Sequence, residues 1–214
     1  MGRPREHDEQ TRARLRAAAE RIVASDGPGA LSVRAVADEA GTSTRAIYAL
    51  FGSKDGLLVD ALAQGAFEFL ADGIEQLRLT RDPVADLVAV GVPVFRRLVI
   101  EHPVLYRVAF QRIVPALRAG PELIAARERA FAQLLSRVQR VKDAGLLGRK
   151  SVRIAAVEFN AMLEGLANAE LRGAILRILP AGEEERTWHD ALLTVVRGFS
   201  AGSRSPRPMK KRSR

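Results

Sequence analysis

The 214-residue sequence contains no cysteine, which excludes disulfide bonds, thiolate zinc sites and cysteine nucleophiles together. Its three histidines, His7, His102 and His189, do not share a metal-ligand spacing, so we predict neither a metal site nor a cofactor. There is no run of about 18 apolar residues that could cross a membrane. The charged N-terminal residues also lack the apolar stretch of a secretory signal. We therefore expect a cytoplasmic protein with no membrane partner.

Aromatic residues are scarce, at 5% of the chain, whereas helix-forming alanine, leucine and arginine are abundant. Apolar residues recur at helical spacing, and strict alternation never reaches convincing strand length. The sequence therefore predicts an all-α fold of about nine helices. Short helices fill the first 52 residues and longer ones follow, so we place the main division near residue 52.

The positive charge is concentrated at the C-terminal end. The last eleven residues contain six basic and no acidic residues, so the rest of the chain carries +3 of the total net charge of +9. The high isoelectric point is thus mostly a property of this tail, which we predict to be disordered over 203–214. Tails of this kind also favour polyanions, so the tail alone gives no evidence that the folded body binds nucleic acid.

Two short predicted helices, 33–40 and 44–51, are joined by about three residues. Ser32 and Ser43 are good N-caps, and Gly41 suits the tight turn between the helices. The small Ala37 would let the helices approach closely, and Ile47 would fill the space between them. This pattern describes a helix-turn-helix, although an αα-corner that binds nothing has the same geometry.

The outward face of the second helix would carry Thr44, Arg45, Tyr48 and Ala49. Hydrogen-bonding side chains beside one small residue suit a DNA groove, where base edges and phosphates are the partners.

Residues 9–58 resemble the N-terminal domain of the tetracycline-repressor (TetR) family of bacterial transcription regulators. The resemblance depends on Ile22 and the alanines before it, on Asp26-Gly27, on the run 32–37, on Gly41-Thr42-Ser43, and on the run 47–55. It implies a three-helix DNA-binding domain over 1–52, with an arm at 1–7, and a helical ligand-binding and dimerisation domain over 53–202.

The resemblance also implies roles for single residues. Ser43, Tyr48 and Lys54 would contact phosphates, which positions the protein without reading sequence. Thr44, Arg45 and Ala49 would face base edges, with Arg34 and Thr42 as secondary candidates. Leu50 stands where the family usually has histidine, so the phosphate contact of that histidine is in doubt. Arg3 and Arg5 on the arm would either enter the minor groove or form a frayed, solvated end.

The second domain would hold the ligand and the dimer interface. Trp188-His189 resembles a subgroup with a Trp-His-Gly signature, although Asp190 replaces the glycine. Helices 151–172 and 184–200 would form a four-helix homodimer interface, the latter through Leu192, Val195, Val196 and Phe199. Asn160, Glu164 and Asn168 form a polar stripe, either solvated or facing a ligand. The candidate ligand-pocket residues are Phe67, Phe95, Tyr106, Phe110, Phe131, Phe159 and Met162.

The function that these patterns predict is a ligand-responsive repressor that binds a palindromic operator as a homodimer and is released by an unidentified small-molecule inducer. An enzyme is the first alternative, but the sequence lacks the Glu-x-x-His pairs of di-iron bundles, a nucleophile elbow and a P-loop. The second alternative is a nonspecific DNA binder that depends on the basic tail. We therefore predict no catalytic residues.

Overall fold

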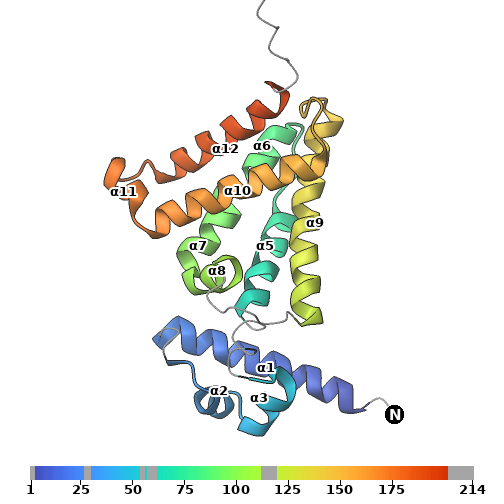
Figure 1. Ribbon diagram of the computed structural model, residues 1–214, viewed down its shortest axis with the longest axis vertical. Coiled ribbons are helices and arrows are strands. Elements are labelled where there is room, and N and C mark those ends of the chain that lie inside the picture. The colour runs from blue at the N-terminus through green and yellow to red at the C-terminus, as the bar shows by residue number, and fades with distance from the viewer. Residues whose placement is uncertain (1–2, 27–29, 54–55, 57–61, 112–119, 202–214) are drawn as a thin grey trace, which may run out of the picture. The chain divides into compact units, whose positions relative to one another are not determined.

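The computed structural model describes residues 3–26, 30–53, 56, 62–111 and 120–201. Every regular element within these ranges is a helix, which confirms the predicted all-α fold. Among the described helices, none is long and apolar enough to cross a membrane. In chain order (Figure 1), the elements are α1 (Arg3–Asp26), α2 (Val33–Glu39), α3 (Thr44–Phe51), α5 (Gln64–Gln76), α6 (Pro83–Val88), the π-helix η3 (Gly91–Arg96), α7 (Arg97–Glu101), α8 (Pro103–Phe110), α9 (Pro121–Asp143), α10 (Val152–Leu171), α11 (Ala174–Ile178) and α12 (Glu184–Ala201).

The backbone packs into two compact units. Unit 1 comprises residues 1–77 and 93–133, and unit 2 comprises 78–92 and 134–214. Unit 1 therefore contains the whole predicted DNA-binding domain together with helices that we assigned to the second domain. The functional boundary at residues 52–53 stays a prediction, because backbone packing does not report function.

Helices α1, α2 and α3 pack on one another in unit 1 (Figure 1), and their buried residues belong to an apolar cluster that also includes Val108 of α8 and Leu123 of α9. Leu15, Ala18 and Ala19 of α1 are fully buried against α2 and α3. The small Ala37 and the wedge residue Ile47 are buried between the helices, as predicted. Burying these apolar side chains stabilises the three-helix arrangement by removing their surface from water.

Two helix boundaries differ from the predictions. The first helix begins at Arg3 rather than near residue 8, so residues 3–7 of the predicted arm are helical. The pair Asp82-Pro83 predicts one helix to about residue 101 with a kink at Pro93, but the structure has α6, η3 and α7 there, and Pro93 lies in η3. Because proline has no N–H, it removes one hydrogen bond from an α-helix, and a π-helical turn is one way to accommodate that loss.

In unit 2, α12 packs along both α10 and α6. Trp188, Leu192, Val196 and Phe199 place one face of α12 in the core, each at most 2% exposed. Gly91 permits this packing, since a Cβ atom at that position would lie 2.1 Å from Cδ1 of Leu192.

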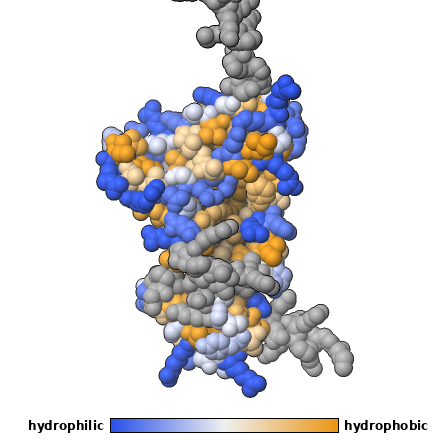
Figure 2. All heavy atoms as spheres, viewed as in Figure 1, coloured by the Kyte–Doolittle hydropathy of each residue, from blue (hydrophilic) through white to orange (hydrophobic). Residues whose placement is uncertain are grey.

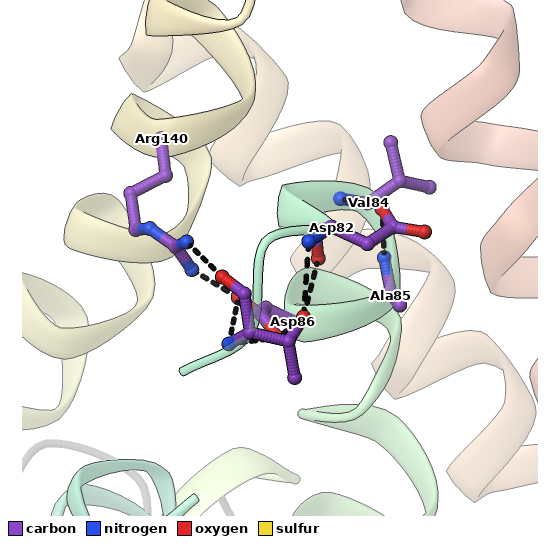
Figure 3. Close-up of polar contacts among 6 residues, drawn as sticks. Asp82, Val84, Ala85, Asp86 and Arg140 are labelled. Atoms are coloured by element: carbon purple, nitrogen blue, oxygen red, sulfur yellow. Dashed lines mark hydrogen bonds and ion pairs between the residues drawn. The ribbon is translucent and has the colours of Figure 1, made fainter. Parts of the chain in front are cut away.

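A buried carboxylate joins the loop before α6 to α9 within unit 2 (Figure 3). Asp86 is 3% exposed, accepts hydrogen bonds from the backbone N–H and hydroxyl of Thr80, and forms an ion pair with Arg140. Burial alone would raise the pKa of Asp86, but the hydrogen bonds from Arg140 and Thr80 outweigh it and lower the pKa below its ordinary value.

Candidate nucleic-acid interface

The turn between α2 and α3 is closed by two backbone hydrogen bonds. The N–H of Thr42 donates to the carbonyl of Ala37 at 2.9 Å, and the N–H of Gly41 donates to the carbonyl of Asp38 at 3.2 Å. This is the Schellman ending of a helix, which requires a left-handed residue, and Gly41 has a φ of 63°. The predicted glycine turn is therefore present.

Helix α3 begins at a serine cap. The Ser43 Oγ accepts a hydrogen bond from the backbone N–H of Ala46 at 3.3 Å, as predicted. Ile47 and Phe51 then point into the core, with exposed fractions of 0% and 9%. Because these side chains set the rotation of the helix, its opposite face is directed outward.

The outward face of α3 carries the predicted DNA-contacting residues. Thr44, Arg45 and Ala49 are exposed, and Tyr48 is 55% exposed. Figure 2 shows hydrophilic side chains projecting from the α2–α3 end of unit 1. This face therefore presents hydrogen-bonding groups on a helix whose rotation is fixed by buried apolar residues.

The remaining candidates lie around that face. Ser43 is exposed at the start of α3, and Thr42 is half-buried in the turn. Arg34 on α2 is strongly exposed, and its Nε lies 4.0 Å from the Asp38 carboxylate. A contact this long between exposed charges contributes little to stability, so the Arg34 guanidinium is available to an external anion. Lys54 lies outside the described residues.

Leu50, which stands at the position of the family's usual histidine, is half-buried and packs against the α1–α3 core. An aliphatic side chain there adds apolar contact but has no N–H to donate to a phosphate. The departure from the family pattern thus replaces a polar group with an apolar contact.

Two side-chain contacts from α1, one to α2 and one to α3, were not predicted. The Arg21 Nε donates to the Glu39 carboxylate of α2 at 2.9 Å, and the Arg12 guanidinium lies over the Phe51 ring of α3 at 4.8 Å from its centroid. Helical spacing places both arginines away from the apolar face of α1. Nothing in their helical spacing identified partners that lie 18 and 39 residues further along the chain.

Four of the predicted pocket residues form an aromatic cluster in unit 1. The Phe110 ring centroid lies 5.4 Å from Phe67, 5.4 Å from Phe95 and 5.1 Å from Tyr106. The structure therefore brings Phe67, Phe95, Tyr106 and Phe110 together. Phe131 is half-buried in the same unit. Rings that pack on one another also serve as ordinary core, so their role as a ligand pocket stays a prediction.

Phe159 and Met162, the other two pocket candidates, lie on α10 in unit 2. Phe159 is fully buried there, while Met162 is half-buried. On the predicted polar stripe of the same helix, the Asn160 amide donates to the Glu164 carboxylate at 2.6 Å. Asn160, Glu164 and Asn168 are all half-buried. Their burial therefore does not decide between a solvated stripe and a stripe that faces a ligand.

Of the Trp188-His189 pair, the tryptophan lies in the core and the histidine on the surface. The Trp188 indole is fully buried and its Nε1–H donates to the Glu170 carboxylate at 2.8 Å, whereas His189 is exposed beside Asp190. Trp188 therefore joins α12 to α10. No group of three or more histidines, aspartates and glutamates in the described parts of the chain is arranged to hold a metal ion.

Comparison with known protein families agrees with this geometry. Residues 15–61 match the family of bacterial regulatory proteins called tetR, and residues 87–195 match the tetracyclin repressor-like C-terminal domain. The chain belongs to the TetR family. TetR proteins are DNA-binding transcription regulators that form dimers and respond to small molecules; they are not enzymes. The predicted Trp-His-Gly subgroup stays a prediction.

Solved structures share the TetR fold over most of the chain. A protein of unknown function from Rhodococcus sp. RHA1 is 24% identical, with a TM-score of 0.67 over 90% of this chain and 94% of that one. A TetR regulator from Marinobacter aquaeolei VT8 is 22% identical, with a TM-score of 0.58 over 89% and 97%. RolR in complex with resorcinol is 17% identical, with a TM-score of 0.65 over 95% and 98%. No curated protein matches the sequence.

Proposed function

We propose that this TetR protein is a cytoplasmic, homodimeric repressor that binds a palindromic operator and leaves it when a small-molecule inducer binds. The observation that carries the proposal is the outward face of α3, where Thr44, Arg45 and Tyr48 are exposed while Ile47 is fully buried. A helix held in this way can enter the major groove without rotating or losing its core contacts.

The proposed contacts divide between phosphates and bases. Ser43, Tyr48 and Lys54 would bind phosphates and so position the protein on the duplex. Arg45 would read a guanine through both of its terminal nitrogens, a contact worth about 1–3 kcal/mol of discrimination. Thr44 and Ala49 would lie against neighbouring base edges, and Arg34 and Thr42 would add contacts at the periphery.

An apolar stripe on α10 supports the homodimer. Ile154 and Val157 are 54% and 59% exposed, and the small residues Ala161 and Gly165 continue the stripe along the same helix. Exposed apolar side chains beside small residues allow two helices to approach closely and lose water. A homodimer would supply two α3 helices, one for each half-site of a palindromic operator, and such half-sites lie about 34–36 Å apart.

For α12 we propose a smaller part in this interface than the sequence predicts. Leu192, Val196 and Phe199 are each at most 2% exposed within their own chain, so they belong to the core of unit 2. Among the α12 residues that we proposed for the interface, Val195 alone keeps accessible surface. The proposed contact is therefore centred on α10.

The ligand response is proposed by analogy with the family and with RolR, which was solved with resorcinol. Binding of a small molecule to one of two dimer states would shift the population toward that state. If that state separates the α3 helices wrongly for the operator, the repressor leaves the DNA.

A band-shift assay of the full-length protein on the DNA upstream of its own gene tests this proposal. We expect a specific complex whose affinity falls steeply with salt, because phosphate contacts release counterions. Arg45→Ala should relax sequence preference, whereas Lys54→Ala should weaken all sequences equally. Arg186→Ala, at an exposed arginine of α12, is the matched control and should leave binding unchanged.

Failure to bind any upstream fragment at low salt would refute the regulator proposal. If Arg45→Ala and Lys54→Ala had the same effect on every sequence, the assigned division between base and phosphate contacts would be wrong. Removal of 203–214 separates a regulator, which keeps its specific complex, from a binder that depends on the basic tail.

A further inference from the structure

Unit 1 contains an open cleft of about 660 Å³ between α1, α5 and the α7–α8 junction. Much of its wall is apolar, formed by Leu62, Phe69, Ile100, Pro103, Val104 and Leu105. None of the seven aromatic and methionine residues that we predicted for the ligand pocket belongs to this wall. The cleft is therefore separate from the predicted pocket, and it is large enough for a drug-sized molecule.

Two carboxylates line the cleft without an ion pair to any described residue. Glu20 of α1 forms neither an ion pair nor a hydrogen bond with any described residue, and Glu68 of α5 accepts only from the neutral amide of Gln64, at 2.6 Å. Two arginines lie near these carboxylates. Arg21, which also lines the cleft, pairs at 2.9 Å with Glu39 outside the wall, and Arg16 lies 3.9 Å from Glu122. The third wall carboxylate, Glu101, is 3.5 Å from Arg97.

Glu20 is a half-buried carboxylate of the cleft wall. Burial raises its pKa, and the negative charge of Glu68 raises it further, while Arg16 and Arg21 compensate only in part. Gly65 of α5 leaves the space that the carboxylate occupies, because a Cβ atom there would lie 2.7 Å from Glu20 Oε1. The carboxylate thus lies against α5, and the positive charges of Arg16 and Arg21 compensate its burial only in part.

We propose that this cleft binds an organic cation, a molecule with an apolar body and one ammonium group. The apolar wall would bury the body, and the ammonium would lie between Glu20 and Glu68 and relieve their repulsion. A partly desolvated carboxylate gains more from such a partner than one in water does, since the local dielectric constant is lower. An organic cation is then the chemical class of the inducer in the proposed function. Binding of the cation does not depend on that function, whereas its effect on DNA binding does.

Isothermal titration calorimetry on the full-length protein without DNA tests the proposal. The probes are 4-phenylbutylamine, 4-phenylbutanol and 4-phenylbutyrate, which share one apolar body and differ in charge. At pH 7.5 the alkylamine is protonated, as a lysine side chain is. We expect the amine to bind at least tenfold more tightly than the alcohol, and the carboxylate to bind more weakly than both. Equal affinity for amine and alcohol, or no binding of the amine, would overturn the proposal.

Glu20→Gln locates the site. This variant should lose about tenfold in affinity for 4-phenylbutylamine and keep its affinity for 4-phenylbutanol, with an unchanged circular dichroism spectrum. The matched control is Glu128→Gln, an exposed glutamate of α9 in the same unit that does not line the cleft, and it should bind the amine as the unchanged protein does.

The variants also keep this inference separate from the proposed function. If Glu20→Gln and Glu128→Gln bound the amine equally well, the cation would lie elsewhere and the inference would be wrong, even if operator binding were observed. If the amine bound as expected but no operator complex formed, the cleft assignment would stand and the repressor proposal would fall.

Discussion

The outward face of α3 in unit 1 and the buried Asp86 site in unit 2 differ in whether their polar groups are paired within the chain. On α3, Thr44 and Arg45 are exposed, and no hydrogen bond or ion pair joins their side chains to another described residue. At Asp86, the carboxylate is buried and accepts from Thr80 and Arg140, which itself also donates to the Thr80 carbonyl at 2.7 Å (Figure 3).

The difference separates polar groups that hold the fold from polar groups that are free to bind. A buried charge must be paired or its desolvation is not compensated, so the Asp86 site is a structural element. An exposed arginine without a partner costs the fold little, which leaves its full hydrogen-bonding capacity for another molecule. Substitutions in the two regions should therefore affect different measurements.

Ile47→Ala should have the largest effect on stability. The side chain is fully buried between α2, α3 and α1, so its truncation should lower the free energy of unfolding by about 3 kcal/mol. Urea unfolding followed by circular dichroism measures the loss. Ala49→Ser on the outward face of the same helix is the control and should change stability by less than about 0.5 kcal/mol. Equal losses would show that α3 is not oriented as described.

Asp86→Asn should come next, with a loss of about 2–3 kcal/mol, because the Arg140 guanidinium loses its carboxylate partner inside unit 2. The same urea assay applies. Asp72→Asn removes a carboxylate from the exposed Arg129 pair and should change little. A similar loss for both variants would mean that the Asp86 site is no more important than a surface ion pair.

Acidification should erase the difference between the parent protein and Asp86→Asn. Since the folded-state pKa of Asp86 is lowered, its carboxylate contributes stability above the unfolded value of about 3.9, and this contribution falls as the pH drops through the folded pKa. Urea unfolding at intervals from pH 7 to pH 3 should show the two stability curves converging at the acidic end. Curves that stay parallel would contradict the lowered pKa.

Gly41→Ala should cost about 1–2 kcal/mol, since the residue has a φ of 63° and a Cβ atom there is strained even though no atom lies within 4 Å of it. Gly198→Ala is the matched control, because that glycine lies inside α12 with equally open space and no left-handed φ. It should be neutral or slightly stabilising in thermal unfolding. If both variants behaved alike, the left-handed turn would not be required.

Arg45→Ala should have the smallest effect on the fold, less than about 0.5 kcal/mol, because the exposed guanidinium is not part of the core. Thermal unfolding without DNA measures it, alongside the loss of sequence preference expected in the band-shift assay. A large loss of stability would show that Arg45 supports the fold, and its assignment to base recognition would then lack its physical basis.

The local features of this protein could be predicted from its residues alone. Serine caps, the glycine turn and the spacing of Ala37 and Ile47 act over one or two helical turns, so their pattern predicted α2, α3 and the outward face of α3. The absence of cysteine and of long apolar runs excluded whole classes of site before any contact was known.

The contacts between distant parts of the chain became visible only in the folded protein. Arg140 meets Asp86 across 54 residues, Glu20 comes to lie against Gly65, and Leu192 turns into the core and not toward a partner. Such pairings depend on how helices pack, and helical periodicity identifies which residues share a face without identifying what that face contacts. The cleft that contains Glu20 and Glu68 exists only because packing brought together residues that are more than forty positions apart.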